Sequence, residues 1–343
     1  MPSAPVLVAP DAFKGTFSAA QVAASIGRGL EAGGVIADPC PVADGGEGTL
    51  AVLLGALGGE TRGTRAHDPL GRPRPAGFAL LEDGGTALVE VAEAGGLQLV
   101  GPPTPAAAWA ATSRGTGELV AAAVAEGAAV VLVAAGGSAT TDGGAGAIDA
   151  IDAAGGLRGA QLVVLCDVTV PWEACARIFA PQKGADPTTV ARLEARLDAL
   201  ADRLPRDPRG VPGTGAAGGL AGGLWAVYGA VLEPGAPWVL DALDVDARLA
   251  AARAVVVGEG RLDAQSAAGK APGELARRAA TAGVPCHAIV GSVADGFARD
   301  GFAGVTVAGG FPHGGFASVT VAHDLAAIAA AGRTLARSLG PLS

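Results

Sequence analysis

The sequence predicts an α/β protein built on a parallel sheet, and three observations support this fold class. Short apolar runs rich in β-branched residues recur, as at residues 6–8, 130–133 and 254–257. Each run leads into a glycine-containing loop and then into a segment of helical pattern, which is typical of β-α units. An S-x-x-Q capping box, Ser18 to Gln21, marks the start of the first predicted helix.

Residues 1–60 follow a β-α-β-α order. A strand at residues 6–8 precedes a helix at 19–31, which ends at Gly33-Gly34. A short strand around 35–42 precedes a second helix that runs to about residue 57. The loop after each of these strands is rich in acids and glycines. In a doubly wound sheet, such loops meet at the edge where ligands bind.

From residue 61 to about 99 the pattern changes to short strands with β-turn signals, such as Asp68-Pro-Leu-Gly71. This predicts antiparallel structure and a domain boundary near residue 65. The remaining elements alternate again. We expect helices at 106–111, 118–126, 145–153, 189–201, 239–251, 272–282 and 321–338, and strands at 130–133, 162–165, 254–257, 287–290 and 305–307.

Composition excludes several classes of protein. The 343 residues are half apolar, and the net charge of −9 with scattered arginines argues against nucleic-acid binding. The N-terminus has no basic segment, so we expect no signal peptide. The uncharged stretch at 211–232 holds seven glycines and Pro212, which favours a buried turn and helix over a membrane span. Four cysteines without C-x-x-C spacing suit a reducing cytoplasm, where we expect the protein to act.

Lysine usage is unusual. The chain has only three lysines among its 24 basic residues, and each of them, Lys14, Lys183 and Lys270, lies beside a glycine in a loop. Chance is one explanation. The other is that these positions need a compact ammonium group, which a planar guanidinium does not replace. We favour the second explanation, most strongly for Lys14 and Lys270.

Acids gather in the loops that follow predicted strands. Their convergence on one sheet edge with Lys14 and Lys270 would be costly unless a metal ion or phosphate lay between them. The alternative is that each acid is a helix cap or a turn residue, but several glycine-flanked copies favour function. These acids are Asp11, Asp44, Glu47, Glu259 and Asp263.

Residues 258–270, GEGRLDAQSAAGK, are not a P-loop, because Ala271 follows Gly269-Lys270 where the motif needs Ser or Thr. The glycine-rich segment 136–144 offers hydroxyls and amides suited to an anion. Arg114 is a candidate carboxylate fork, although a surface ion pair explains it equally well. The G-x-G-x-x-G match at 213–218 follows no strand, so we discount a dinucleotide site.

At these motifs the sequence resembles the bacterial glycerate kinase family of the glycerate 2-kinase type. The matching stretches keep the family's order and span nearly the whole chain: APDAFKGTFSA (9–19), PVADGGEGT (41–49), TSRGTGEL (112–119), GGSATTDGGAGA (136–147), CDVT (166–169), IFAPQKGA (178–185), GTGAAGG (213–219) and GEGRLDAQSAAGK (258–270). One departure is the short bridge at 151–161, where many family members carry a longer segment. Whether this chain keeps the contacts that the longer segment makes in those family members is therefore left open.

The resemblance implies a fold and a domain organisation. We expect a doubly wound, Rossmann- or flavodoxin-like domain formed by residues 1–65 and 245–343, with a second α/β domain, residues 66–244, inserted into it. The active site would lie in the cleft between them. A homodimer is left open, and no nucleic acid or membrane partner is expected.

The resemblance also implies ATP-dependent phosphorylation of D-glycerate with Mg²⁺, giving 2- or 3-phosphoglycerate. We assign roles as hypotheses. Lys14 and Lys270 would neutralise phosphate charge, and Asp11 or Asp142 would accept the hydroxyl proton. Metal candidates are Asp44, Glu47, Glu259 and Asp263, and substrate or phosphate candidates are Arg114, Ser138, Thr140, Thr141, Lys183 and Ser266. The alternatives are a kinase for another small hydroxy acid and a non-catalytic sugar-acid binding module.

Overall fold

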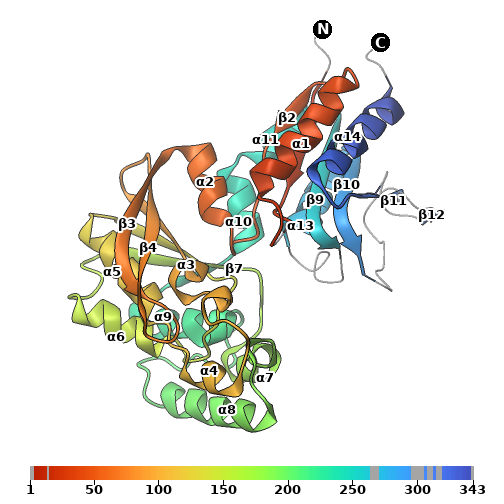
Figure 1. The fold of residues 1–343 in the computed structure, drawn as a ribbon. Coiled ribbons are helices and arrows are strands. Elements are labelled where there is room, and N and C mark those ends of the chain that lie inside the picture. The colour runs from red at the N-terminus through yellow and green to blue at the C-terminus, as the bar shows by residue number, and fades with distance from the viewer. Residues whose placement is uncertain are drawn as a thin grey trace. The chain divides into compact units, whose positions relative to one another are not determined.

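The computed structural model describes residues 4–13, 15–262, 270–294, 305–306, 312–313 and 319–340. The chain forms two compact units (Figure 1). The first joins Met1–Asp44 to Ala236–Ser343, and the second is Gly45–Gly235. An α/β fold in which one domain is inserted into another is therefore confirmed.

The unit boundaries differ from those expected near residues 65 and 245. Residues 45–65 belong to the second unit, because β3 (Gly59–His67) pairs along its whole length with β4 (Pro73–Leu81). At the other end, α10 (Gly235–Ala242) belongs almost entirely to the first unit. It is held there by Arg278, whose guanidinium lies 2.6 Å from Asp241 and donates to the carbonyl oxygen of Pro237.

The first unit contains a five-stranded sheet in which every strand pairing is parallel. Its spatial order is β13-β10-β9-β1-β2. The chain thus starts in β1, next to one edge of the sheet, moves to that edge with β2, and returns on the other side of β1, so the strand order reverses between β1 and β9. The strands are β1 (Val6–Pro10), β2 (Ala37–Pro39), β9 (Ala254–Leu262), β10 (Cys286–Val293) and β13 (Val319–Val321). A separate antiparallel pair joins β11 (Val305–Thr306) to β12 (Pro312–His313).

Helices cover both faces of this sheet, as expected for a doubly wound domain. On one face α1 (Ala19–Ala32) and α14 (Leu325–Leu339) lie side by side (Figure 1) and bury Ile26 and Ile328 against Val6 and Val256. Glycines permit their close approach, because a side chain on Gly29 would collide with the backbone of Ala329. Besides α10, the first unit has α11 (Val245–Ala251) and α13 (Ala271–Ala282) among its described helices; these two contact each other, and α13 also packs against β9 and β10.

Local sequence signals explain how these helices begin and end. Ser18 and Gln21 form the predicted capping box at the start of α1, with both reciprocal hydrogen bonds present. The segment 239–251, expected as one helix, is two helices, because Asp244 adopts a left-handed conformation (φ +52°) between α10 and α11. The final helix begins at Leu325, later than expected, because the Asp324 side chain caps it by accepting from the amide of Ala327.

The second unit contains a six-stranded mixed sheet in sequential order, β3-β4-β5-β6-β7-β8. Its first pairs are antiparallel, as predicted for residues 61–99, and its later pairs are parallel. Beyond β3 and β4, the strands are β5 (Thr86–Glu90), β6 (Val130–Ala134), β7 (Gln161–Cys166) and β8 (Val231–Pro234).

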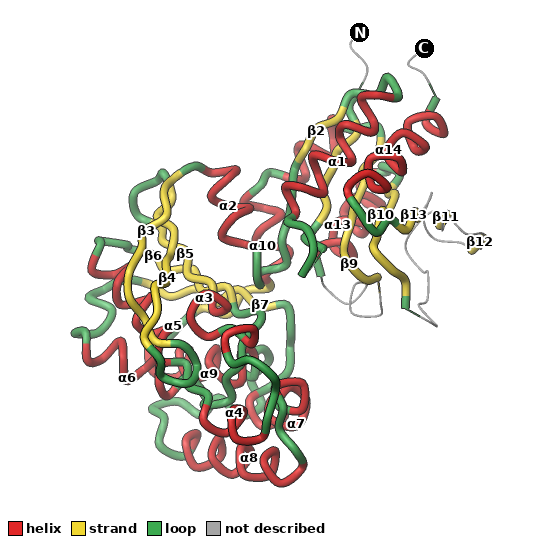
Figure 2. Tube along the Cα trace, viewed as in Figure 1, coloured by secondary structure: helices red, strands yellow, loops and turns green. Residues whose placement is uncertain are grey.

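Figure 2 shows the helices of the second unit in red and its strands in yellow. The α-helices are α2 (Thr49–Leu57), α3 (Val91–Gly95), α4 (Pro105–Ala110), α5 (Arg114–Ala125), α6 (Ala145–Ala153), α7 (Cys175–Phe179), α8 (Pro187–Ala201) and α9 (Leu220–Tyr228). Short 3₁₀ turns are Leu97–Leu99, Trp172–Ala174, Pro181–Lys183 and Ala216–Gly219.

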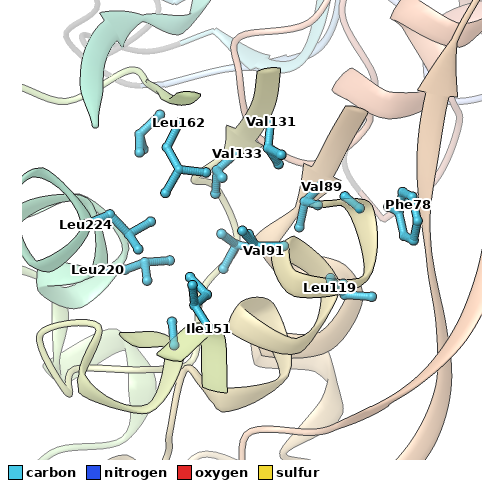
Figure 3. Packing of buried hydrophobic residues seen from close by; sticks show 14 of the residues in the cluster. Phe78, Val89, Val91, Leu119, Val131, Val133, Ile151, Leu162, Leu220 and Leu224 are labelled. Carbon is cyan, nitrogen blue, oxygen red and sulfur yellow. The ribbon is translucent and has the colours of Figure 1, made fainter. Parts of the chain in front are cut away.

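Branched aliphatic side chains fill the core of the second unit (Figure 3). Val89, Val131 and Val133 point from the strands towards Leu119 and Leu220 of the helices. A second cluster surrounds Trp172, whose indole donates to the carbonyl oxygen of Leu197 at 3.2 Å. All four cysteines are buried and free, as expected. Within the described ranges, every helix is too short or too polar to cross a membrane.

Candidate active site

The first unit contains a cavity of about 500 Å³ at the carboxyl ends of β1 and β9. The two strands are in register there, with Pro10 opposite Gly258, and the amide of Asp11 donates to the carbonyl oxygen of Gly258 at 2.8 Å. Asp11 and Glu259 therefore follow neighbouring strands at the same level. This position is where the strand order reverses, the usual ligand-binding point of an open α/β sheet.

Three acids line this cavity, and all are buried. Asp11 is 5% exposed, Asp44 2% and Glu259 7%. Burial of carboxylates is costly unless donors, cations or a metal ion compensate for the lost hydration. The structure thus brings together three of the five acids that the sequence singled out.

Lys270 lines the same cavity, half-buried, at the residue that caps α13. Pro272 falls in the first turn of that helix, where its missing amide hydrogen costs no intrahelical hydrogen bond, so the sequence favours a helix start directly after Lys270. The predicted residues Lys14, Asp263 and Ser266 lie outside the described residues.

Carboxylate oxygens are the ligands that Mg²⁺ prefers, and in kinases one or two of them suffice because substrate phosphates and water supply the rest. Asp11, Asp44 and Glu259 fit this requirement by chemistry and by burial. A complete protein cage is not seen, since in the part of the chain that the structure describes no three His, Cys, Asp or Glu residues group closely enough to hold an ion.

Sequence patterns did not single out several other lining residues. Phe13 and Phe17 pair across a tight turn, each amide bonding to the other's carbonyl at 2.9 and 3.0 Å, with Thr16 between them. Arg261, Ser292 and His323 also line the cavity. Ser292 near the end of β10 and His323 just after β13 belong to no motif, so no spacing marked them, although the rule that ligands bind beyond strand ends would have found them.

The glycine-rich segment 136–144 lies in the second unit, and its hydroxyls are turned inward. Ser138, Thr140 and Thr141 are 8%, 1% and 1% exposed. The hydroxyls of Ser138 and Thr140 lie 3.0 Å apart and approach the carbonyl oxygen of Ala217, a residue with φ +51°. These side chains therefore build the loop, and its exposed part is the backbone at Gly137.

Asp142, which the sequence suggested as a proton acceptor, has its carboxylate engaged in hydrogen bonds within the second unit. Its carboxylate already accepts from the amide and hydroxyl of Ser113 and from the amides of Gly144 and Gly146. These bonds join the start of α5 to the start of α6, which makes Asp142 a structural residue. Its role as a catalytic base stays a prediction.

Lys183 is not a surface phosphate ligand, since only 4% of it is exposed. Its Nζ donates to the carbonyl oxygen of Thr140 at 2.5 Å, beneath the 136–144 loop. Burial lowers the pKa of Lys183 to about 8, an effect that neighbouring Cys175 and Asp142 partly offset. Arg196 supports the loop in the same way by donating to the carbonyl oxygen of Thr141.

For Arg114 the sequence left two roles open, a fork for a substrate carboxylate and a surface ion pair, and the structure shows an ion pair. Its Nε donates to Glu118 at 2.8 Å, one helical turn along α5, and more than half of its side chain is exposed. Glu118 also accepts from the backbone and ring of His67, and although burial raises its pKa, the hydrogen bonds from Arg114 and then His67 lower it overall. Binding of a substrate carboxylate by Arg114 would compete with this pair.

Glu47 is exposed and belongs to the second unit, whereas Asp44 belongs to the first. The neighbouring start of α2 is occupied by another acid, Glu90, which accepts from the amides of Gly48 and Leu50. Burial raises the pKa of Glu90. Sequence reasoning missed this cap because Glu90 lies 42 residues from Gly48.

Comparison with known proteins decides the family. A sequence model of the glycerate kinase family matches residues 6–155 and 148–312, most of the chain. The chain belongs to the glycerate kinase family. The resemblance expected from the motifs is confirmed, and with it an enzyme of the kinase class.

Relatives in the glycerate kinase family match over similar lengths. Glycerate 2-kinase of Escherichia coli is 36% identical over 329 residues, covering 84% of this chain and 86% of that protein. Glycerate kinase of Bacillus subtilis is 36% identical over 325 residues, covering 84% and 85%. An uncharacterised protein of Mycobacterium tuberculosis is 42% identical over 308 residues, covering 85% and 80%.

A solved structure of a family member shows the same fold. The crystal structure of a protein assigned as glycerate kinase 2 from Salmonella typhimurium LT2 has a TM-score of 0.79 and 31% identity, and covers 98% of each chain. The two-domain α/β fold of the glycerate kinase family is therefore shared over the whole length.

Proposed function

We propose that this enzyme phosphorylates D-glycerate, with ATP as the donor and Mg²⁺ as the metal ion. Family membership supports the reaction class. One observation carries the site: Asp11, Glu259 and Lys270, which come from opposite ends of the sequence, line a single cavity at the strand reversal. Phosphoryl transfer depends on positioning and on charge stabilisation, and this group of side chains supplies both kinds of charge.

The buried acids have two roles in this proposal. Asp44 and Glu259 present carboxylate oxygens for the metal ion, which when bound neutralises charge on the transferred phosphoryl group. Asp11 lies in the same cavity and is the candidate to accept the proton of the glycerate hydroxyl, a role that Asp142 does not fit. Burial keeps water from competing for both roles.

Lys270 supplies the positive charge. Its ammonium lies at the cavity wall, where it would hold a phosphate oxygen of ATP as that oxygen gains negative charge. We propose the same role for Lys14, on sequence grounds. Both positions need a compact, freely rotating donor group, which agrees with their survival as lysines in an arginine-rich chain.

The 136–144 loop of the second unit contributes to substrate binding through its backbone in this proposal. The hydroxyls of Ser138 and Thr140 are engaged internally, so the backbone at the exposed Gly137 is the part of the loop proposed to bind an anion. The product is proposed to be 2-phosphoglycerate, because the Escherichia coli relative is a glycerate 2-kinase.

The test is an assay of ADP formation with Mg²⁺, ATP and D-glycerate, run beside L-glycerate, lactate and tartronate. We expect turnover with D-glycerate that EDTA abolishes and excess Mg²⁺ restores. Phosphorus NMR of the product should show the phosphate on the 2-hydroxyl. Turnover with a different hydroxy acid alone would replace the substrate, and no ADP formation with any of them would refute the kinase proposal.

A further inference from the structure

Arg196 lies on α8, a helix that belongs to none of the family motifs, yet it contacts the backbone beside two of them. α8 packs against α4 in the second unit (Figure 1). The Nη1 of Arg196 donates to the carbonyl oxygen of Trp109 at 3.0 Å, and its Nη2 donates to the carbonyl oxygen of Thr141. One guanidinium therefore bridges the last turn of α4 and the 136–144 loop.

The ring of Trp109 fixes the orientation of this bridge. The guanidinium carbon of Arg196 lies 4.6 Å from the centre of the ring, and that of Arg192 lies 4.0 Å from it. Arg192 is exposed, whereas Arg196 is partly buried. A planar group that stacks on an aromatic ring and donates in two directions has a geometry that a lysine ammonium does not reproduce.

The charge of Arg196 also faces an acid of the 136–144 loop. Burial lowers the pKa of Arg196, and the nearby carboxylate of Asp142 partly offsets this effect. Asp142 in turn accepts from the amide and hydroxyl of Ser113. Two consecutive loop residues are thus tied to the segment 109–113: Thr141 through its carbonyl oxygen and Arg196, and Asp142 through its carboxylate and Ser113.

The two linked segments carry exposed groups that suit an anionic substrate. Arg114, which directly follows Ser113, exposes more than half of its side chain, and Gly137 is exposed in the 136–144 loop. A small substrate that contacts both segments needs a fixed spacing between them. A displacement of about 1 Å in such a site can lower the reaction rate ~100-fold.

We propose that Arg196 is a positioning residue of the enzyme: without touching the substrate, it sets the spacing between the segment 109–114 and the 136–144 loop. The inference rests on the proposed function, in which the loop binds substrate. An apolar side chain could pack on Trp109 without the cost of burying a charge, so the benefit of an arginine at this place is the bridge that it makes.

Steady-state kinetics of Arg196→Lys and Arg196→Ala test this inference. The lysine variant keeps a positive charge beside Asp142 but lacks the fork, so both variants should raise KM for D-glycerate at least tenfold and leave KM for ATP within twofold. A residue needed only for stability would change the active fraction, which lowers kcat and leaves both KM values unchanged. The control is Arg192→Ala, which removes a contact with the same ring but neither bond of Arg196, and it should keep the wild-type KM values.

Amide hydrogen exchange of the folded variants, measured by mass spectrometry, needs no turnover. Arg196→Lys should speed exchange in both segments, 109–114 and 136–144, whereas Arg192→Ala should not. The inference is wrong if Arg196→Lys keeps the wild-type KM for D-glycerate, or if exchange in the two segments stays as in the wild type. If the wild-type chain phosphorylates no glycerate, the proposed function fails, and the exchange measurement alone then supports or overturns the link made by Arg196.

Discussion

The amide of Asp11 donates a 2.8 Å hydrogen bond to the carbonyl oxygen of Gly258, and this bond sets the geometry of the candidate active site. It is the last link of the parallel pair β1–β9, so the acid that follows each strand enters the cavity at the same level. Gly258 allows this approach because a side chain there would meet Pro10 and the carbonyl oxygen of Ile289, each at 2.9 Å.

Glu259→Gln should lower kcat for glycerate phosphorylation by about 100-fold or more, because it removes a buried negative charge where the metal ion is proposed to bind. Steady-state kinetics over a range of Mg²⁺ concentrations would measure this. The control is Glu31→Gln, an exposed acid of α1 outside the cavity. An unchanged kcat and Mg²⁺ dependence in Glu259→Gln would remove this residue from the metal site.

Lys270→Ala should lower kcat by about 100-fold or more with the fold intact, and Lys14→Ala should do the same. Lys270→Arg should not restore activity, since a planar guanidinium cannot take the place of a rotating ammonium. Circular dichroism would check the fold and the ADP assay the rate. Near-normal turnover in both alanine variants would refute the roles assigned to these lysines.

Asp142→Asn should destabilise the second unit by about 1–3 kcal/mol. The new side-chain NH₂ group would face the backbone amide of Ser113 or Gly144, so that this buried amide would lose its hydrogen-bond acceptor. Urea denaturation would measure the loss, with exposed Asp149→Asn on α6 as the control. If Asp142 is structural, the folded variant, assayed well below its unfolding temperature, should retain kcat within about tenfold of the wild type. Loss of a catalytic base would lower kcat by ~10²–10⁴-fold. Full stability with abolished turnover would instead identify Asp142 as the base.

Gly218→Ala should destabilise the protein by about 3 kcal/mol, the sum of a left-handed backbone penalty and a collision with the carbonyl of Thr140. Gly34→Ala separates the two causes, because Gly34 has φ +80° with no atom near its missing side chain. It should cost only about 1 kcal/mol. Equal losses in the two variants would show that backbone strain alone requires these glycines.

Lys183 should make stability rise with pH relative to Lys183→Met. The folded-state pKa of about 8 lies below the ordinary 10.5, so below pH 8 the folded protein bears the full cost of a buried charge. Between pH 8 and 10.5 the folded state releases the proton first, and stability increases by about 2 kcal/mol by pH 9.5. Urea unfolding of both proteins at pH 7 and 9.5 measures this. A constant difference between them would show that Lys183 keeps its ordinary pKa.

Much of the fold follows from local signals that the sequence displays. The capping box at Ser18 depends only on residues within one turn, and the apolar runs that became β1, β6 and β9 are buried strands that need little context. The placement of Asp11 and Glu259 on one edge also followed from the sequence, because the carboxyl ends of parallel strands always share an edge.

Features that depend on distant partners were not predictable in this way. The inward turn of the Ser138 and Thr140 hydroxyls requires the carbonyl of Ala217, and the burial of Lys183 requires α7 and the loop above it. Within the glycine-rich segment 213–219, which imitates a dinucleotide motif, Gly218 and Gly219 pack closely against Thr140 and Gly143. A sequence shows which groups are present, but not which of them the tertiary fold already occupies.

The interrupted course of the first sheet has a consequence for the order in which the chain folds. β1 ends at Pro10 and its neighbour β9 begins at Ala254, so about 240 residues must leave the ribosome between them, which takes roughly 12–50 s at ~5–20 residues per second. The second unit, whose strands pair in sequential order, can form during that interval. Until β9 emerges, the apolar strand β1 has only β2 of its two partner strands, so one of its edges stays open to pairing with another chain.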